Sequence, residues 1–261
     1  MLGTLYLHVV TLNLFVMWIA PISTNAIHLK MTITKMSNGR KQLYTQMKPN
    51  NINVLVACEE SQRVTIAFRD RGFNAFSCDM VKCSGKHPEW HIIGDCLVNF
   101  KTPVKFTTED GKRHQVKHWH LIIAHPPCTY LCRVSAVQLV HDGEIDPLRL
   151  EKMYQARDFF MKCLVAPADY VAIENPIPMR RAELPRPSCF IEPYWFGHKY
   201  TKKTFLWLRN LPPLLPTVTH PHPKEFVRAS RGKYRSRTFP GIAKAMAQQW
   251  GNIILDDLRN K

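Results

Sequence analysis

Acidic side chains are scarce in this sequence of 261 residues. Asp and Glu number 20 against 36 Lys and Arg, so the formal net charge is +16 at pH 7. Such a surface repels cationic partners and attracts polyanions, because each phosphate that pairs with Lys or Arg releases a condensed counterion. We therefore expect a nucleic acid as the partner, and a basic surface that is merely solvated is the alternative.

The first 29 residues contain no Asp, Glu, Lys or Arg, so the basic start of an ordinary secretory signal peptide is missing. A long uninterrupted apolar run is also lacking, since His8, Asn13 and Pro21 break the apolar stretch Leu5–Ile22. A helix that spans a membrane needs about 20 apolar residues. We expect residues 1–50 to be a poorly structured extension without stable membrane association. A signal or anchor segment is the open alternative.

The cysteines do not indicate a small secreted protein held together by disulfides. A chain of this length can bury a sizeable apolar core without such staples. Cys58 follows an apolar, strand-like run, and Cys128 follows two prolines. Reduced thiols and an intracellular location, in cytoplasm or nucleus, are therefore expected. The eight cysteines are Cys58, Cys78, Cys83, Cys96, Cys128, Cys132, Cys163 and Cys189.

Short apolar runs alternate with helical patterns from Asn51 onward. This alternation predicts an α/β fold, with a mostly parallel sheet covered by helices on both faces. One domain is expected over residues 51–256, with a hairpin or loop insertion at 101–118 and a basic, proline-rich segment at 177–237. The expected strands are 53–58, 73–78, 91–95, 121–124 and 170–173, and the expected helices are 63–71, 146–164 and 241–250.

Polar side chains follow the ends of these predicted strands. Ligands of such sheets bind outside the carboxyl ends of the strands, so the clustering predicts a binding site. Asp79, which ends the second strand, is expected to accept hydrogen bonds from the ribose hydroxyls of an adenosine cofactor. Asp95 ends the next strand and is expected near the adenine amino group. Both aspartates could instead be turn or capping residues. The polar ends are Cys58–Gln62, Asp79, Asp95, His125–Tyr130 and Glu174–Pro176.

Two short motifs resemble the DNA cytosine-C5 methyltransferase family. Pro127-Cys128 matches the nucleophile loop that follows the fourth strand of that family, and Glu174-Asn175 matches the Glu-Asn-Val motif after its fifth strand. Residues 53–250 are also similar to phage- and virus-encoded proteins described as cytosine methyltransferase-like. This resemblance implies a Rossmann-like, S-adenosylmethionine-dependent methyltransferase fold and a DNA substrate in preference to RNA. It rests on the stretches Ala57–Gln62, Ala124–Leu131 and Phe239–Ala247.

The resemblance assigns catalytic roles to Cys128, Glu174 and Asn175. Attack of the Cys128 thiolate on C6 of cytosine breaks aromaticity and lets C5 accept a methyl group from the sulfonium. The carboxyl group of Glu174, expected in protonated form, would hold N3 and the exocyclic amine. A base in a duplex must flip out to reach the thiol. Pro126 and Pro127 would fix the loop, because their φ angles are set. A structural cysteine beside a rigid loop is the alternative.

Glycine is missing from the loop Cys58–Gln62, where the cytosine-C5 family has a Gly-rich cofactor loop. The backbone cannot approach a cofactor in the same way, so Glu59 or Glu60 is expected to hold the methionine ammonium. This departure favours the alternative of a basic nucleic-acid-binding protein that keeps the fold without methyl transfer. The expected contacts to S-adenosylmethionine are Cys58, Glu59, Glu60, Ser61, Asp79, Asp95 and Pro126.

The stretch from Arg180 to Arg237 contains 13 basic and three acidic residues, with aromatic side chains interleaved. This combination is typical of a surface that tracks a nucleic-acid strand. Aromatics in the core with solvated charges are the alternative. Arg235-Ser-Arg237 is similar to the Gln-x-Arg-x-Arg motif of the cytosine-C5 family, without its leading Gln. The expected nucleic-acid contacts are Lys202, Lys203, Arg235 and Arg237.

The motif His125-Pro-Pro-Cys128 also resembles the Asp/Asn-Pro-Pro-Tyr motif of adenine-N6 and cytosine-N4 methyltransferases. That chemistry needs an acceptor for the amino hydrogens and an aromatic platform. His125 replaces the first poorly, and Cys128 does not provide the second. An amino methyltransferase is therefore a further alternative to the C5 reaction.

One pattern is compatible with a metal. Four side chains with the spacing C-x4-C-x3-H-x3-H could bind zinc tetrahedrally. However, the first cysteine neighbours the expected ribose carboxylate, and Pro88 constrains the loop, so we expect no metal there. The four residues are Cys78, Cys83, His87 and His91.

Overall fold

A computed structural model of the chain describes residues 48–219, 227–228 and 236–260. These residues belong to one unit that spans Gln46–Lys261. Most of the expected N-terminal extension lies outside the described residues. No described helix combines the length and the hydropathy that a membrane crossing requires.

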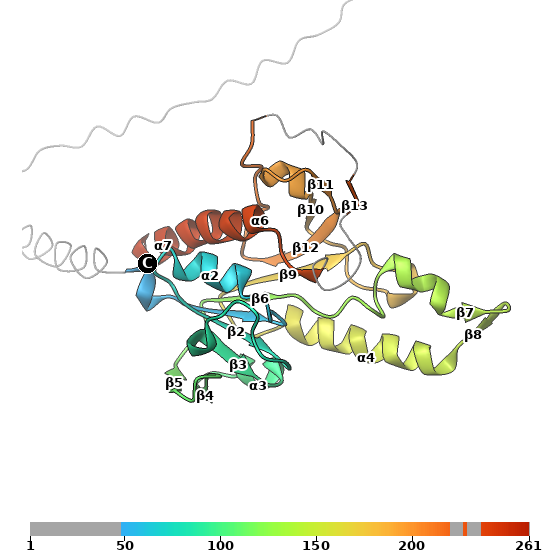
Figure 1. Cartoon of the computed structure of the whole chain (residues 1–261), viewed down its shortest axis with the longest axis horizontal. Helices are drawn as coiled ribbons and strands as arrows, with labels where there is room; N and C mark the ends of the chain where they lie inside the picture. The colour runs from blue at the N-terminus through green and yellow to red at the C-terminus, as the bar shows by residue number, and fades with distance from the viewer. Residues whose placement is uncertain (1–47, 220–226, 229–235, 261) are drawn as a thin grey trace, which may run out of the picture. The chain divides into compact units, whose positions relative to one another are not determined.

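A seven-stranded sheet forms the centre of this unit (Figure 1). Its strands are β1 (Asn53–Ala57), β2 (Asn74–Asp79), β3 (His91–Ile93), β6 (Leu121–Ala124), β9 (Tyr170–Pro176), β10 (Cys189–Ile191) and β12 (Thr204–Arg209). Their order across the sheet is β10-β12-β9-β6-β1-β2-β3. All neighbours are parallel except that β12 runs antiparallel to both β9 and β10. The predicted α/β class with a mostly parallel sheet is confirmed.

The strand order reverses at β1. Val54 of β1 faces Ala75 of β2 on one side and Leu121 of β6 on the other. The chain moves outward from β1 through β2 to β3 and then returns to β6 and β9. The loops that follow β1 and β6 therefore diverge. In Rossmann-like sheets, such a reversal opens a crevice that binds ligands.

Alternate residues of the central strands pack on opposite faces of the sheet. Val54 and Val56 belong to one buried cluster, and Leu55 and Ala57 to the other, as the two-residue period of a strand requires. Burial on both faces explains why these strands are continuous apolar runs. The first face is covered by α2 (Arg63–Arg69), α6 (Pro240–Ala245) and α7 (Gly251–Asn260), and the second by α3 (Cys96–Phe100) and α4 (Pro147–Leu164) (Figure 1).

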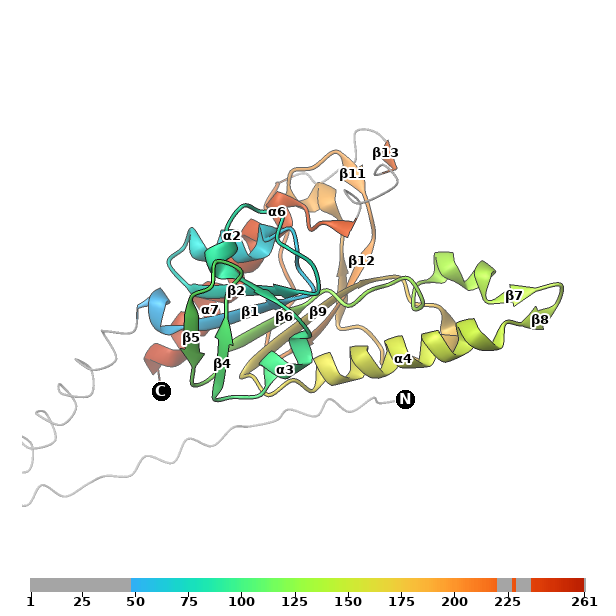
Figure 2. The same cartoon turned by 60° about the horizontal axis from the view of Figure 1, so that its bottom comes forward.

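The remaining elements are short. The hairpin predicted within 101–118 is confirmed. A second hairpin precedes α4. This second hairpin and the start of α4 extend beyond the sheet (Figure 2). The short strands are β4 (Val104–Thr107), β5 (Arg113–Val116), β7 (Val140–His141), β8 (Glu144–Ile145), β11 (Tyr200–Thr201) and β13 (Val227–Arg228). The 3-10 helices are η1 (Pro49–Asn51), η2 (Pro88–Trp90), η3 (Arg133–Gln138), η4 (Arg180–Ala182) and η5 (Pro193–Phe196).

The C-terminal helical segment is longer than the predicted helix 241–250. α6 continues through a π-helical turn, η6 (Met246–Trp250), into α7. Gly241 lets the start of α6 approach η5 closely, since a Cβ atom at this position would lie 2.1 Å from the carbonyl oxygen of Phe196. The packing of α6 against η5 therefore requires glycine.

The segment 177–237 contributes to the core as well as to the surface. β10 and β12 extend the sheet, and the side chain of Trp207 in β12 is 2% exposed. Phe196 is buried too, whereas Tyr200 is half-buried. The alternative that the aromatic residues belong to the core is correct for Trp207 and Phe196.

Candidate active site

A cleft of about 410 Å³ opens at the carboxyl ends of β1, β6 and β9. The loops after these strands form its walls, so it lies where the strand order reverses. Side chains that sequence patterns indicated separately meet here, although they are far apart in the chain. The predicted residues among its walls are Cys58, Glu59, Glu60, Ser61, Asp79, Pro126, Cys128, Glu174, Lys202 and Arg237.

A second cavity of about 250 Å³ adjoins the cleft and shares Cys58, Asp79 and Pro127 with it. Its walls are largely apolar, with Phe159 of α4 among them, and they include Asp95. Oδ1 of Asp95 accepts a hydrogen bond of 2.9 Å from the backbone N–H of Leu97. The capping role considered for Asp95 is therefore present, beside its place in the cavity wall. Asp79 faces both spaces and can contact a ligand that extends through them.

His125, one of the polar residues expected at the strand ends but given no catalytic role from the sequence, lines the cleft. Nδ1 of His125 is 2.8 Å from Oε2 of Glu174, and the two side chains are 10% and 12% exposed. The sheet register explains this contact. Ala124, the last residue of β6, faces Ile173 of β9, and the residues that follow them in the chain are His125 and Glu174. Nζ of Lys202 lies 4.0 Å from Oε1 of the same carboxylate.

Glu174 is ionised in this arrangement. Burial favours the neutral carboxyl group, but the charge of Lys202 and the hydrogen bond and charge of His125 outweigh burial and lower the pKa of Glu174 to about 2. The surroundings in the free site therefore favour the carboxylate, whereas the resemblance implied a protonated Glu174 against the base.

The surroundings of His125 favour its charged form. Burial disfavours the imidazolium, but the hydrogen bond to Glu174 and the charges of Glu174 and Glu59 raise the pKa of His125 above its ordinary value. Its other ring nitrogen, Nε2, is buried and has no hydrogen-bond partner among the described residues. The two groups form a hydrogen-bonded histidine–carboxylate pair at the wall of the cleft.

Asn175, expected to be catalytic, lies behind the cleft and not in its wall. Its side chain is fully buried, and Nδ2 donates a hydrogen bond of 3.1 Å to the carbonyl oxygen of Pro126. The carbonyl is in the loop that carries Cys128, so this bond holds the loop against β9. Asn175 is thus placed to position the thiol, and it does not reach into the cleft.

Cys128 lies in the wall of the cleft, beside a second thiol that sequence reasoning missed. The backbone N–H of Cys132 donates a 3.0 Å hydrogen bond to the carbonyl oxygen of Cys128, so the two thiols are one turn apart. Cys132 precedes η3, and its Sγ lies 3.4 Å from Oγ of Ser135. The four-residue spacing of Cys128-Thr-Tyr-Leu-Cys132 was the available signal in the sequence.

The two thiols ionise unequally. Interaction with the Cys128 thiol, and hydrogen bonds from the side chain and backbone of Ser135 and the backbone of Val134, lower the pKa of Cys132 to about 5. Interaction with Cys132, burial and the nearby charge of Glu174 raise the pKa of Cys128. Cys132 is therefore the more acidic thiol of the pair, and Cys128 the less acidic one.

The two glutamates of the loop after β1 have different surroundings. The carboxylate of Glu59 is used at the start of α2, where it accepts hydrogen bonds from the backbone N–H groups of Val64 (2.6 Å) and Thr65 (3.1 Å). Oε1 of Glu60 lies 3.4 Å from Nε of Arg237, and Oε2 of Glu60 has no hydrogen-bond partner among the described residues. Of the two candidates for binding an ammonium group, Glu60 is the one with capacity to accept further hydrogen bonds.

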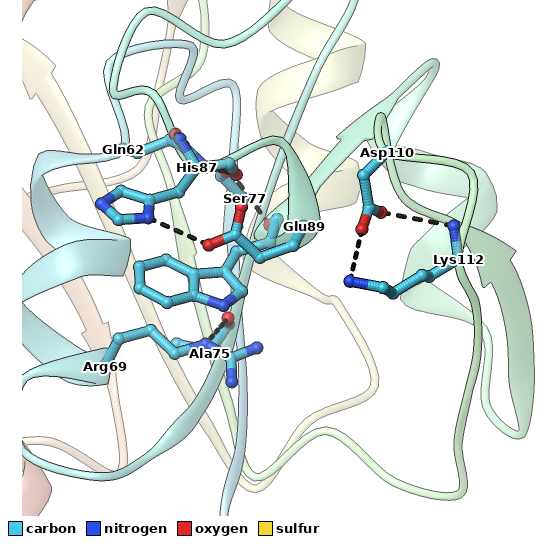
Figure 3. Close-up of polar contacts among 9 residues, drawn as sticks. Gln62, Arg69, Ala75, Ser77, His87, Glu89, Asp110 and Lys112 are labelled. Atoms are coloured by element: carbon cyan, nitrogen blue, oxygen red, sulfur yellow. Dashed lines mark hydrogen bonds and ion pairs between the residues drawn. The ribbon is translucent and has the colours of Figure 1, made fainter.

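The loop Cys58–Gln62 makes its turn without glycine by placing two ordinary residues in the left-handed region. The φ angles of Cys58 and Gln62 are 58° and 57°, a conformation that costs such residues free energy. The side chain of Gln62 holds the turn, since its Nε2 donates to the carbonyl oxygen of His87 (2.8 Å) and its Oε1 accepts from the N–H of His87 (3.1 Å) (Figure 3).

The residues of the possible zinc pattern have other partners. Nδ1 of His91 lies 2.9 Å from Oγ of Ser77, and its Nε2 lies 2.8 Å from the carbonyl oxygen of Val81. Nδ1 of His87 lies 3.0 Å from Oε1 of Glu89 (Figure 3). In the described part of the chain no three Cys, His, Asp or Glu side chains are arranged to hold a metal ion.

The predicted nucleic-acid contacts are found in different places. Lys202 and Arg237 line the cleft. Lys203, the residue after Lys202, is exposed, and its Nζ lies 4.0 Å from the ring centroid of Phe190. Arg235 lies outside the described residues. The mouth of the cleft therefore has basic groups, of which Lys202 also contacts the ionised Glu174.

A search of protein-family models finds no match to this chain, and a search of curated proteins finds none either.

Proposed function

We propose that this protein transfers a methyl group from S-adenosylmethionine to C5 of a cytosine base in DNA. The observation that carries the proposal is that Cys128 and Glu174, 46 positions apart in the sequence, line the same cleft at the carboxyl edge of a Rossmann-like sheet. A thiol and a carboxyl group in one cleft can act on the two sides of a pyrimidine, at C6 and at N3.

The cofactor would extend through both cavities. Asp79 faces both of them and suits the ribose hydroxyls, while the apolar wall with Phe159, together with Asp95, suits an adenine ring. Glu60 would take the methionine ammonium, because its Oε2 has no hydrogen-bond partner among the described residues. S-adenosylmethionine would supply an electrophilic methyl group at the boundary of the two cavities.

The nucleophile is generated by the thiol pair. Cys132, the more acidic of the two, accepts the proton of Cys128 as that sulfur forms its bond to C6 of cytosine. Asn175 and the two prolines keep the Cys128 loop in place during this step. After methylation the proton on C5 passes to water, the electrons of the C5–H bond form the C5–C6 double bond, and the Cys128–C6 bond breaks. The sulfur of Cys128 then takes back the proton that Cys132 accepted.

DNA would approach through the basic mouth of the cleft. Lys203 and Arg237 would contact phosphates near the target nucleotide. Cys128 lies in the wall of the cleft, where it cannot reach a base that is stacked within a duplex. The target cytosine would therefore be flipped out of double-stranded DNA.

The test is nucleoside mass spectrometry of DNA and RNA from cells that express the protein. We expect 5-methylcytosine in DNA with the native chain and none with Cys128→Ser, because a hydroxyl is a far weaker nucleophile than a thiolate. Cys189→Ser is the matched control, since Cys189 of β10 does not line the cleft, and it should leave the modification unchanged.

Calorimetry with S-adenosylmethionine accompanies this test. We expect the Cys128→Ser variant to bind the cofactor with unchanged affinity, since the thiol acts on the base. Modification that persists in Cys128→Ser rejects this nucleophile. N4-methylcytosine or N6-methyladenine in its place would identify an amino methyltransferase.

A binding protein without methyl transfer is the second candidate. The observation that favours it is the loop Cys58–Gln62, which holds two residues with positive φ where the related enzymes have glycine. This candidate predicts DNA binding without saturable binding of S-adenosylmethionine, so the same calorimetry distinguishes the two.

A further inference from the structure

The proposed reaction requires a proton that Glu174 does not carry. When a thiolate adds to C6, electrons move toward N3 of cytosine, and an acid at N3 stabilises the adduct. The free site instead holds Glu174 as a carboxylate beside Lys202 and His125. The proton must therefore be stored on a neighbouring group.

We propose that His125 stores this proton and delivers it through Glu174 to N3 of the target cytosine. The inference rests on the proposed function. Nδ1 of His125 and Oε2 of Glu174 are 2.8 Å apart, a distance at which a proton passes along an existing hydrogen bond. The sheet register fixes this contact, because the two residues follow paired positions of β6 and β9.

The surroundings of His125 favour a stored proton over one that is lost to solvent. Glu174 from β9 and Glu59 from the loop after β1 face the ring with negative charge, while Lys202 opposes them from the loop before β12. Nε2 is buried without a hydrogen-bond partner among the described residues. The bond from Nδ1 to Glu174 is thus the route by which the proton leaves.

The transfer balances in protons and charge. As the Cys128 sulfur bonds to C6, the C5–C6 π electrons move into the C4–C5 bond and the C4–N3 π electrons move to N3. N3 takes a proton from the carboxyl group of Glu174, which takes one from Nδ1 of His125. The result is a neutral imidazole, a carboxylate and a neutral enamine adduct. When the Cys128–C6 bond breaks after methylation, the proton returns from N3 to His125 by the same path.

Lys202 has a different role. Its Nζ is 4.0 Å from Oε1 of Glu174, beyond an ordinary hydrogen bond, and its charge keeps the carboxylate ionised while the cleft is empty. Lys202 is therefore a positioning residue, and His125 is the proton store.

The first test is the pH dependence of methyl transfer by His125→Gln. Glutamine keeps an N–H donor for Glu174 but cannot store a proton. We expect the rate at pH 7.5 to fall about a hundredfold, as loss of a general acid does, with cofactor binding unchanged. The rate of the native protein should decrease at high pH, because His125 loses its proton there. This decrease at high pH should be absent in His125→Gln. His118→Gln, which alters another histidine–carboxylate pair at 2.8 Å, is the matched control.

The second test needs no activity. In ¹⁵N NMR of the free protein, with His125 assigned from the spectrum of His125→Gln, we expect an imidazolium at pH 7.5. In Glu174→Gln the His125 ring should become neutral at that pH. A neutral His125 in the native chain overturns the inference even if DNA is methylated. A charged His125 in a protein that methylates nothing supports the proton store and rejects the proposed function.

Discussion

At the scale of single residues, the candidate chemistry depends on two pairs of neighbouring side chains, of which Cys128, His125 and Glu174 line one cleft. Cys132 is the more acidic of the two thiols, and His125 and Glu174 are joined by a hydrogen bond. Cys128, expected to attack the base, is the less acidic thiol of its pair, and Glu174, expected to donate a proton to the base, favours its carboxylate form. Cys132 and His125 are the partners that would hold the negative charge and the proton. The surroundings of a residue thus decide its role as much as its chemical type does.

The thiol pair makes a prediction about Cys132→Ser. Cys132, with a pKa lowered to about 5, is ionised above that pH and can accept the Cys128 proton at neutral pH. In Cys132→Ser the interaction with Cys132 no longer raises the pKa of Cys128, but burial and the charge of Glu174 still do. Cys128 also has no neighbouring thiolate to accept its proton, so the rising limb of the pH–rate profile should move above neutral. We expect at least about a tenfold lower rate of methyl transfer at pH 7, within the usual contribution of a general base.

The measurement is the initial rate of methyl transfer between pH 5 and pH 9. Alkylation by iodoacetamide at pH 6, followed by peptide mass spectrometry, should modify Cys132 before Cys128 in the native chain. An unchanged pH profile in Cys132→Ser would show that Cys128 ionises without this partner.

At the scale of elements, the closing helix shows how one small residue determines packing. Gly241→Ala would place a Cβ atom 2.1 Å from the Phe196 carbonyl oxygen, so α6 or η5 must shift. Overpacking of this kind costs about 1–3 kcal/mol. We expect the free energy of unfolding, measured by urea denaturation, to fall by about 2 kcal/mol.

The control is Lys244→Ala, at an exposed position of the same helix. This variant should change the free energy of unfolding by less than about 0.5 kcal/mol. An equal loss in both variants would contradict the steric explanation.

The parallel strands were predictable, because strands buried on both faces are continuous apolar runs. The Cys128 and Glu174 motifs could be placed at one edge for the same reason, since each follows such a strand. The antiparallel β12 was not predicted, because its residues lie in a basic, proline-rich segment whose aromatic side chains fit a surface equally well.

The partners of the site residues could not be read from the sequence. The contact of His125 with Glu174 depends on the register of β6 against β9. The contact of Lys202 with Glu174 depends on the course of the loop before β12. Glu59, expected at the cofactor, lines the cleft and also accepts hydrogen bonds from the start of α2. Sequence patterns placed the reactive groups, and their ionisation follows from contacts that only the folded chain makes.

At the scale of the whole molecule, the net charge of +16 should dominate affinity for DNA. Removing one Lys or Arg that pairs with a phosphate lowers the slope of log affinity against log salt by about one. We expect Lys203→Ala to have this effect, because this exposed lysine neighbours the cleft residue Lys202. Fluorescence anisotropy with labelled duplex DNA between 50 and 300 mM salt measures it.

The control for this measurement is Lys112→Ala. Lys112 lies in the β4–β5 turn, where its Nζ is 2.9 Å from Oδ2 of Asp110 (Figure 3), and its removal should leave the salt slope unchanged. Equal slopes for the native chain and Lys203→Ala would place the DNA elsewhere on the surface.

The central claim is that the sulfur of Cys128 bonds to a cytosine while the cofactor methylates C5. Duplex DNA that contains 5-fluorocytosine tests it most directly, because fluorine cannot leave C5 as a proton does and the adduct persists. After incubation with S-adenosylmethionine and digestion, we predict a peptide in which Cys128 carries the methylated fluoropyrimidine, formed only when the cofactor is present. An adduct on Cys132 instead, or intact DNA with an unmodified Cys128 peptide, would contradict the claim.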